Sequence, residues 1–351
     1  MDKAYTIHAN RIAVGIMMLA LLLSGVSSAE TITVNASGSA DYTSIQDAVD
    51  AANNGDTITV SPGTYYENVF VNKSVNLVGA GADVTTIHAS DPDTHVLYIR
   101  TDGVNISGFT ITGGTGGTHP LDSAGIFLSI TNNTTIFDNN ISNNFYGIFI
   151  FSGLNNNLTR NFVISNYYGI FLMFSSNNTI YNNLFNNHNN FGSSGNNIWN
   201  TTKQSGTNIA GGQYLGGNFW ADLLGTGYSQ TCADDDLDGV CDYGYALSPG
   251  NMDYLPLTIQ LGYINGSVFG DGNEIFGAII STNTGVSVTT DMSGLYSILV
   301  PAGTYNLTAT KDPEYLMNNS VFVTSIPGTT VEQDIELVKK PTGNITGKVT
   351  S

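Results

Sequence analysis

A 22-residue repeat occurs three times in succession, at residues 125–146, 147–168 and 169–190, and it limits the fold more than any other feature of the chain. Each copy begins with Gly-Ile-Phe, and the positions that agree between the copies hold apolar residues or asparagine. We call each set of equivalent positions a column; the columns are Ile126/Ile148/Ile170, Phe127/Phe149/Phe171, Leu128/Ile150/Leu172, Ile136/Leu158/Ile180 and Asn139/Asn161/Asn183. A fixed period of this length predicts a solenoid, in which each repeat buries its apolar side against its neighbours.

The residues between the columns favour strands over helices. Short β-branched and aromatic runs alternate with Asn and Gly, which leaves no room for the helix of a leucine-rich repeat. Each repeat is therefore expected to be one coil of a right-handed parallel β-helix, a single-stranded solenoid in an all-β chain. Coils stack about 4.7–4.9 Å apart, so equal residues lie above one another. Asn tolerates the left-handed conformation, so the Asn139 column is expected to form a corner.

The N-terminal residues of the chain predict export. Lys3 and Arg11 precede an apolar run at 12–26, and small residues at 27–29 suit cleavage of a signal peptide before Glu30. The run is short for a membrane span, and no second long apolar segment follows, so the mature chain is expected to lack a transmembrane segment. These features predict an extracellular or cell-surface location.

Two further features agree with export. Cys232 and Cys241 are close in sequence and are expected to form a disulfide. Thirteen Asn-x-Ser/Thr triplets could accept N-linked glycans, although an Asn- and Thr-rich chain forms many by chance. They begin at Asn35, Asn72, Asn105, Asn132, Asn133, Asn140, Asn157, Asn177, Asn200, Asn265, Asn306, Asn318 and Asn344. The net charge of −18 argues against nucleic acid and anionic membranes as partners.

The remaining sequence divides into further parts. Residues 43–53 read as a short amphipathic helix, capped by Ser44 with Asp47 three residues on, and a helix here would cover the open end of the solenoid. Residues 262–338 alternate apolar and polar residues between turns, which predicts an antiparallel β-sandwich. The expected organisation is signal peptide 1–29, β-helix 30–200, closing segment 201–260, sandwich 261–340 and the start of a truncated second sandwich at 341–351.

Three phrases carry a resemblance to a known superfamily: Tyr42-Thr-Ser-Ile-Gln-Asp-Ala-Val, Gly55-Asp-Thr-Ile-Thr-Val and Pro62-Gly-Thr-Tyr-Tyr-Glu-Asn-Val. Residues 31–258 resemble the pectin-lyase-like β-helices, and most closely their NosD-like, surface-layer-associated branch common in archaea. This resemblance implies the fold, but the superfamily includes lyases, hydrolases, epimerases and adhesive stalks. The copper association of NosD does not transfer by residue: His88, His95, His119 and His188 have no common spacing, and Met173 is alone in its column.

A second resemblance concerns the sandwich. Its phrases Thr290-Asp-x-x-Gly-x-Tyr and Pro301-x-Gly-Thr-Tyr-x-Leu are similar to those of carboxypeptidase-regulatory-like domains. That family implies a spacer or adhesive module without peptidase chemistry.

An Asp-rich loop is the sharpest candidate for a metal site. Asp234, Asp236, Asp238 and Asp242 surround a Gly turn at 239, and hard oxygen ligands in this pattern suit Ca²⁺. The loop resembles the opening of an EF-hand and the thrombospondin type 3 repeat, but Tyr245 replaces the EF-hand's twelfth-position Glu. A structural Ca²⁺ loop braced by the two cysteines is expected, and a solvated acidic loop is the alternative.

The coils offer little for catalysis. Asp138 is the only acid of the three repeats, and it aligns with Arg160, which predicts an ion pair between coils. A Gly-rich insertion at 112–124 carries His119 and Asp122, the only candidate acid–base pair. Alternation points the rings of Phe127, Phe149 and Phe171 outward, where they would suit a sugar or would only stiffen the sheet.

These observations favour an exported structural or adhesive protein of the cell surface. Its expected partners are polysaccharides or other envelope components, and its expected cofactor is structural Ca²⁺, without a copper site. The alternative is a polysaccharide lyase, hydrolase or epimerase that acts in the groove beside the insertion at 112–124.

Overall fold

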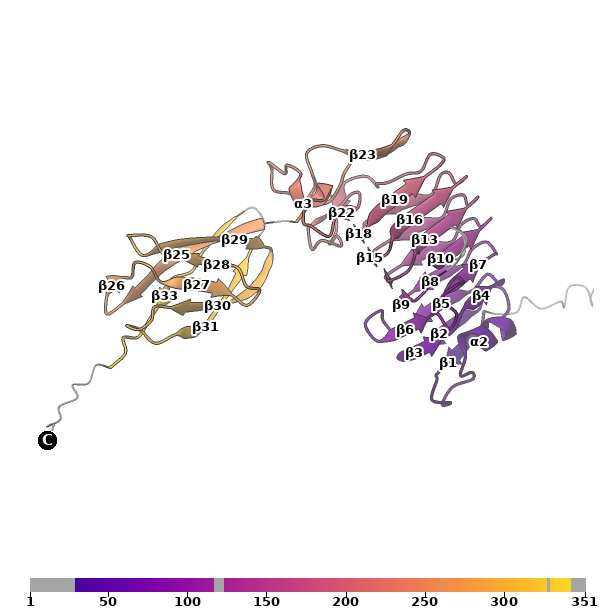
Figure 1. Ribbon diagram of the computed structural model, residues 1–351, viewed down its shortest axis with the longest axis horizontal. Helices are drawn as coiled ribbons and strands as arrows, with labels where there is room; N and C mark the ends of the chain where they lie inside the picture. Colours follow the sequence, from indigo (N-terminus) through magenta and orange to yellow (C-terminus); the bar gives the residue numbers. More distant parts are fainter. Residues whose placement is uncertain (1–28, 117–122, 260, 327–328, 342–351) are drawn as a thin grey trace, which may run out of the picture.

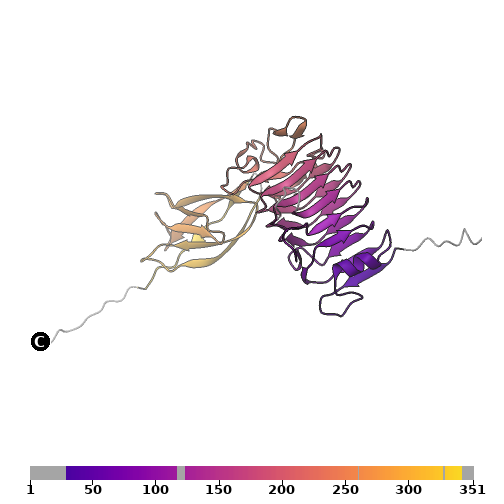
Figure 2. The ribbon, with the colours of Figure 1, turned by 45° about the vertical axis from the view of Figure 1, so that its right-hand side comes forward.

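The computed structural model describes residues 29–116, 123–259, 261–326 and 329–341. Two bodies of β-structure follow one another along the chain: a stack of coils that begins at β1 (Thr31–Val34), and a smaller group of strands that begins at β25 (Leu261–Gly270) (Figure 1). The stack is a right-handed parallel β-helix, as the repeat predicts, and its rungs are seen most clearly in Figure 2.

Three parallel sheets form the walls of the β-helix. Sheet 1 contains β1, β2 (Thr57–Val60), β5 (Asn76–Gly79), β8 (Asn105–Ser107), β11 (Thr135–Phe137), β14 (Asn157–Thr159) and β17 (Thr179–Tyr181). Sheet 2 contains β4 (Val69–Val71), β7 (Leu97–Ile99), β10 (Ala124–Ser129), β13 (Tyr146–Phe151), β16 (Tyr168–Met173) and β19 (Asn189–Ser193). Sheet 3 contains β3 (Gly63–Tyr66), β6 (Thr85–His88), β9 (Thr110–Thr112), β12 (Asn140–Ser142), β15 (Phe162–Ile164), β18 (Leu184–Asn186) and β22 (Phe219–Ala221).

The pairing register follows the repeat. Ile126 pairs with Ile148 and Ile148 with Ile170, so the inward columns stack without a shift. All three side chains are buried, and each coil adds one apolar layer to a continuous core. The stack extends beyond residue 200, because β22 adds a last rung beside β18.

Buried asparagines join one coil to the next at the corners. In the predicted column, Asn139 Nδ2 donates to Asn161 Oδ1 at 3.1 Å, and Asn161 Nδ2 donates to Asn183 Oδ1 at 2.9 Å. Each amide also donates to backbone carbonyls; Asn161 Nδ2, for example, bonds the oxygens of Ile136 and Thr159. Two similar ladders run through Asn144, Asn166 and Asn187 and through Asn156, Asn178 and Asn197.

The left-handed residue of this corner lies one position earlier than the sequence predicted. Asp138, Arg160 and Asn182 have φ values of 56°, 56° and 54°, whereas the ladder asparagines that follow them do not have positive φ. The outward residue turns the chain, and the next residue can then point inward and bond the neighbouring coil. Asp138 and Arg160 form the expected ion pair, at 2.7 Å.

The predicted ladder ends on a buried carboxylate in the closing segment. Asn183 Nδ2 donates to Asn218 Oδ1, and Asp253 Oδ2 accepts the backbone N–H of Asn218 at 2.8 Å and the Trp220 indole N–H at 2.9 Å. Burial raises the pKa of the Asp253 carboxyl to about 7, against these hydrogen bonds, which lower it. Trp220 and Trp199 are buried over the last coil.

A short helix covers the other end. Helix α2 (Ile45–Ala51) buries Ile45, Ala48 and Val49, and the Ser44 side chain accepts the backbone N–H of Asp47 as predicted. The Glu67 carboxylate adds two hydrogen bonds from the first backbone N–H groups of the helix. None of the helices that the structure describes has the length and apolarity needed to cross a membrane.

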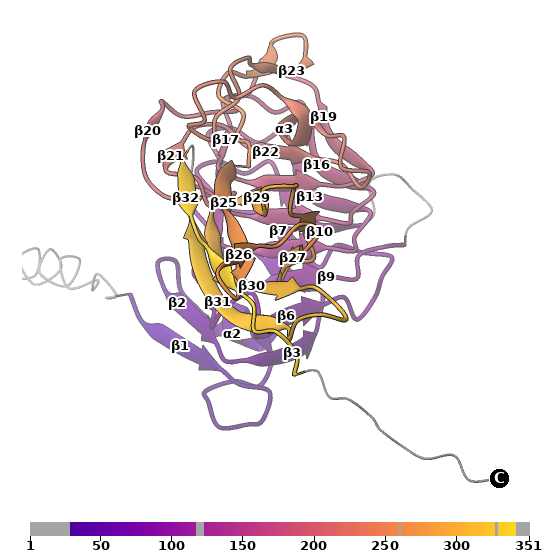
Figure 3. The ribbon, with the colours of Figure 1, turned by 90° about the vertical axis from the view of Figure 1, so that its left-hand side faces the viewer.

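Two further sheets lie C-terminal to the β-helix (Figure 3). One contains β26 (Asn273–Glu274), β25, β29 (Leu295–Pro301), β32 (Thr330–Glu332) and β33 (Ile335–Glu336); the other contains β28 (Ser287–Thr289), β27 (Ile279–Thr282), β30 (Gly303–Thr310) and β31 (Asn318–Ser325). They share one buried core, as expected of a sandwich. The pairing is not wholly antiparallel, because β32 and β33 both run parallel to β25.

We predict that N161A destabilises the β-helix by about 3 kcal/mol, because it leaves several buried polar groups without partners. Urea unfolding followed by circular dichroism measures the change. The control is N72A, which removes an exposed asparagine and should change stability by less than about 0.5 kcal/mol. Equal effects of the two variants would contradict the ladder's role.

Asp253 also predicts a pH dependence. The folded protein keeps this carboxyl protonated up to about pH 7, whereas an unfolded chain releases the proton near pH 4. This group's contribution to stability is therefore full below about pH 4, falls as the pH rises to about 7, and is constant above that. D253N should lose this dependence, so its unfolding midpoint should rise relative to that of the wild type between pH 4 and 7. A pH-independent difference would contradict the assignment.

Candidate functional site

The Asp-rich loop lies between α3 (Tyr228–Thr231) and β23 (Tyr245–Ser248), in the segment that closes the β-helix. Its two ends are joined by a disulfide between Cys232 and Cys241. Both oxygens of Asp234 accept backbone N–H groups, those of Asp238 at 3.0 Å and Gly239 at 2.9 Å. The carboxylate of Asp234 thus organises the turn around itself.

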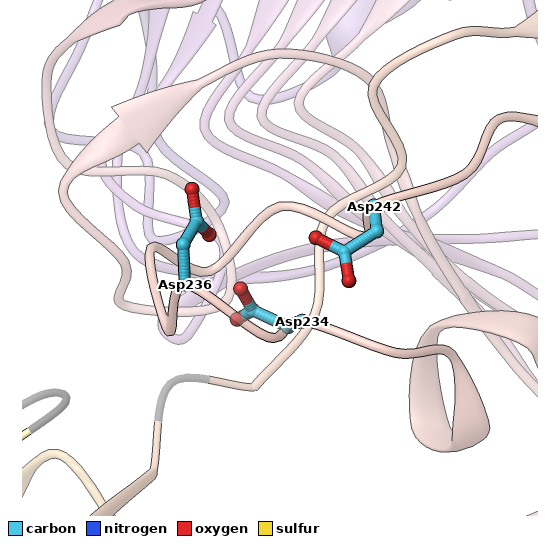
Figure 4. A group of neighbouring side chains, drawn as sticks. All are labelled: Asp234, Asp236 and Asp242. Carbon is cyan, nitrogen blue, oxygen red and sulfur yellow. The ribbon is translucent and has the colours of Figure 1, made fainter.

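Three of the four predicted ligands come together (Figure 4). Asp234, Asp236 and Asp242 each have a carboxylate oxygen within 4.8 Å of those of the other two. Two oxygens that each lie about 2.4 Å from one Ca²⁺ ion can be at most about 4.8 Å apart, so the spacing suits a shared hard cation. Burial raises the pKa of Asp234, as do the negative charges of Asp236 and Asp242, and a cation would relieve that repulsion.

The fourth predicted ligand is directed elsewhere. Asp238 Oδ2 forms an ion pair with Lys203, and its Oδ1 accepts the backbone N–H of Val240 at 2.9 Å. The Lys203 ammonium also lies 5.0 Å from the ring centre of Tyr214. Lys203 is 35 residues away in the chain, so nothing in the local motif revealed this partner.

A continuous row of rings covers the outer side of sheet 2, and we call it the aromatic face. It consists of Phe70, Tyr98, Phe127, Phe149 and Phe171, with successive ring centres 5.2, 5.2, 4.9 and 5.6 Å apart. The row agrees with the predicted outward direction of the Phe column. It begins two coils earlier than the 22-residue repeat. The strands of these two coils are irregularly spaced in the sequence, so the repeat does not predict that their rings join the row.

Phe149 is not available for a ligand, which corrects the prediction for this residue. Its side chain is fully buried, although it points out of the β-helix. The ring of Tyr146 lies 5.2 Å from that of Phe149 and 5.3 Å from that of Phe171, and Tyr168 stacks on Tyr146 at 5.4 Å. The tyrosines cover Phe149, while Phe127 and Phe171 stay partly exposed.

The aromatic face has a small cavity at its N-terminal end. Its volume is about 140 Å³, and it is lined by Asn68, Val69, Phe70, Thr94, His95 and Tyr98. The His95 ring stacks on Phe127 at 4.2 Å, which joins the cavity to the rest of the aromatic face. Two ring faces beside polar groups are a combination that sugars and other amphipathic ligands use.

The described residues do not fit a copper site. His88, His95 and His188 do not converge on one point, and each packs against a different aromatic ring: Tyr66, Phe127 and Tyr167. Within the described residues, the only convergent group of three His, Cys, Asp or Glu side chains is the aspartate cluster, whose hard oxygens are not copper ligands of choice. His119 and Asp122, the candidate catalytic pair, lie outside the described residues.

Comparison with known proteins gives a family and partial relatives. The sequence model of the periplasmic copper-binding protein NosD matches residues 27–225. A cell surface glycoprotein of Methanothermus fervidus is 34% identical over 121 residues, which is 34% of this chain and 20% of that protein. The chain thus spans about a fifth of the length of this curated relative.

Solved structures show weaker likeness. Pectate lyase Pel9A has a TM-score of 0.36 and 17% identity, over 50% of this chain and 62% of its own. Carrot pectin methylesterase has a TM-score of 0.30 and 18% identity, over 57% of this chain and 64% of its own. The minor pilin GBS52 of Streptococcus agalactiae has a TM-score of 0.22 and 18% identity, over 28% of this chain and 52% of its own.

Calcium binding by the aspartate cluster remains a prediction, and its test is thermal. Millimolar Ca²⁺ should raise the melting temperature relative to chelator, because an ion that binds only the folded state stabilises it by mass action. D236N should remove this effect. D235N, which neutralises the neighbouring aspartate outside the cluster, should retain it. Identical melting curves with Ca²⁺ and with chelator would rule out the site.

Proposed function

Because the chain belongs to the NosD family, whose sequence model covers more than half of it, we propose that it is an exported cell-surface protein that binds a neutral polysaccharide through its aromatic face. The β-helix is then a rigid stem that presents the aromatic face, and the closing segment and the two C-terminal sheets connect it to the rest of the envelope. Binding and structural support, rather than turnover, are its work.

The surface location has two supports. The relative from Methanothermus fervidus is a cell surface glycoprotein, and the similarity to it covers about a third of this chain. The first 29 residues have the composition of an export signal.

The observation that carries the binding proposal is the pair of rings beside the cavity at the start of the aromatic face. Phe70 and Tyr98 lie 5.2 Å apart, and 37% of the Phe70 surface is exposed. Ring faces bind the apolar C–H side of a sugar, while the cavity's Thr94 offers a hydroxyl group for hydrogen bonding. The row continues over successive coils, so a long chain could contact more than one ring.

The net negative charge of the chain favours a neutral polysaccharide over an acidic one. The chain has 28 acidic and 10 basic residues, and Asp91 and Asp93 lie near the cavity in sequence. A polyanion such as an acidic polysaccharide would be repelled by this field, whereas a neutral chain would not. The same argument disfavours nucleic acid.

The aspartate cluster has a structural role in this proposal. It lies in the segment that covers the last coil, where Cys241 N donates to Pro256 O at 2.8 Å and Val240 bridges to Leu257. A calcium ion there would fix the cover in place under extracellular conditions, where millimolar Ca²⁺ fills weak sites. The proposal does not involve copper.

The experiment tests whether the removal of single aromatic rings weakens binding to a polysaccharide. Binding of the full mature chain to a panel of neutral and acidic polysaccharides is measured by affinity electrophoresis. F70A and Y98A should each weaken binding to a neutral polysaccharide by about 2- to 12-fold, the equivalent of about 0.5–1.5 kcal/mol. F162A removes a similarly exposed ring from sheet 3 and should leave binding unchanged.

Two results would overturn the proposal. One is an equal loss of binding in F70A, Y98A and F162A, which would separate binding from the aromatic face. The other is depolymerisation of a polysaccharide by the wild type that H119A/D122A abolishes, which would favour a lyase or hydrolase instead.

A further inference from the structure

The asparagines of the Asn-x-Ser/Thr triplets fall into groups that differ in the contacts of their side-chain amides. Five of the asparagines donate their Nδ2 to a neighbouring oxygen: Asn35, Asn105, Asn132, Asn200 and Asn318. Four lie within strands and have a buried amide oxygen: Asn140, Asn157, Asn265 and Asn306. Asn344 lies outside the described residues.

Three acceptors differ from all of these. Asn72, Asn133 and Asn177 are exposed, and their side chains make no hydrogen bond to any other residue that the structure describes. An acceptor needs an accessible Nδ2, because this nitrogen forms the bond to the sugar. Only these three of the described acceptors combine exposure with a free amide.

The three free acceptors also share one edge of the β-helix. Asn72 follows β4, Asn133 lies between β10 and β11, and Asn177 lies between β16 and β17, so each occupies the corner where the chain passes from sheet 2 to sheet 1. Asn133 and Asn177 belong to one column with Asn155, and the three have φ values of 56°, 58° and 57°. The left-handed residue turns its side chain outward, while the residue after it enters the buried ladder.

We propose that this corner is the N-glycosylation edge of the protein, modified at Asn72, Asn133 and Asn177. The donor is an oligosaccharide linked through phosphate to a polyprenol lipid, and a membrane transferase supplies the catalysis. The Asn Nδ2 forms a bond to C1 of the first sugar, the bond from C1 to the phosphate oxygen breaks, the lipid phosphate leaves, and the amide releases one proton.

The corner is favoured whether transfer precedes or follows folding. In the folded protein each strand acceptor lies between paired strands about 4.8 Å away on either side, in the β-helix for Asn140 and Asn157 and in the C-terminal sheets for Asn265 and Asn306, which leaves no space for a transferase or a glycan. A glycan attached earlier to a strand acceptor would have to be accommodated in the same gap, whereas one attached at a corner projects into solvent. Asn133 and Asn177 are two coils, or about 10 Å, apart, so both can be occupied.

The repeat provides a gain-of-site test. Asn155 has the same position and conformation as Asn133 and Asn177 but no acceptor triplet, because Asn157 stands where the triplet needs Ser or Thr. N157T completes an acceptor triplet that begins at Asn155, and it removes the strand acceptor at 157. The substituted Thr joins Thr135 and Thr179 in the same column of sheet 1, so the substitution suits the fold.

The protein is exported from a host that N-glycosylates a reporter of known occupancy, and glycopeptides are mapped by mass spectrometry. We expect glycans at Asn72, Asn133 and Asn177, bare strand acceptors, and one additional glycan at Asn155 in N157T. N133D and N177D, which keep a residue that tolerates positive φ, should each lose one glycan. Strand acceptors occupied while the corner is bare, or no glycan on this protein while the reporter is modified, would overturn the proposal.

Discussion

The stacking of buried asparagine amides from coil to coil is the interaction on which the β-helix depends. A primary amide has two donors and an acceptor oxygen, so one residue can satisfy backbone carbonyls of two coils and still bond its counterpart in the next. Asn161 Nδ2 donates to the carbonyls of Ile136 and Thr159, and Asn161 Oδ1 accepts the backbone N–H of its counterpart Asn139 at 3.2 Å. The amide is neutral, so identical residues can stack at the coil spacing without the repulsion that carboxylates or ammonium groups would create. The low content of charged residues follows from this requirement.

The ladders also determine which surfaces are free for function. Most of the inward amides follow a left-handed residue whose side chain points away from the core, and the strands between corners present every second residue outward. Outward columns therefore have constant positions over many coils. One column holds the rings of the aromatic face, another the free asparagines at the corner between sheets 2 and 1. The same periodic stacking of coils therefore positions both of the surfaces that we propose to be functional.

Much of this could be predicted from sequence because the repeat is local and regular. The period predicts the strand register, the inward Ile column, the Asn139 ladder and the ion pair of Asp138. The unpredicted details depend on contacts between residues that no periodicity relates. Asp238 is paired with Lys203, which lies in a loop outside the repeats, and Phe149 is buried by tyrosines of its own and the next coil. The ring of Tyr98 lies in a coil of different length, where the repeat pattern is absent.

Hydrogen exchange at the corners tests the central role of the ladders most directly. The backbone N–H of Asn139, Asn161 and Asn183 each donates to an amide oxygen of the next rung, although these residues lie between strands. We predict that these amides exchange as slowly as those in the centres of the adjacent strands. If they exchange as fast as the amides of the exposed turn at residues 36–39, the asparagine ladders do not hold the coils together.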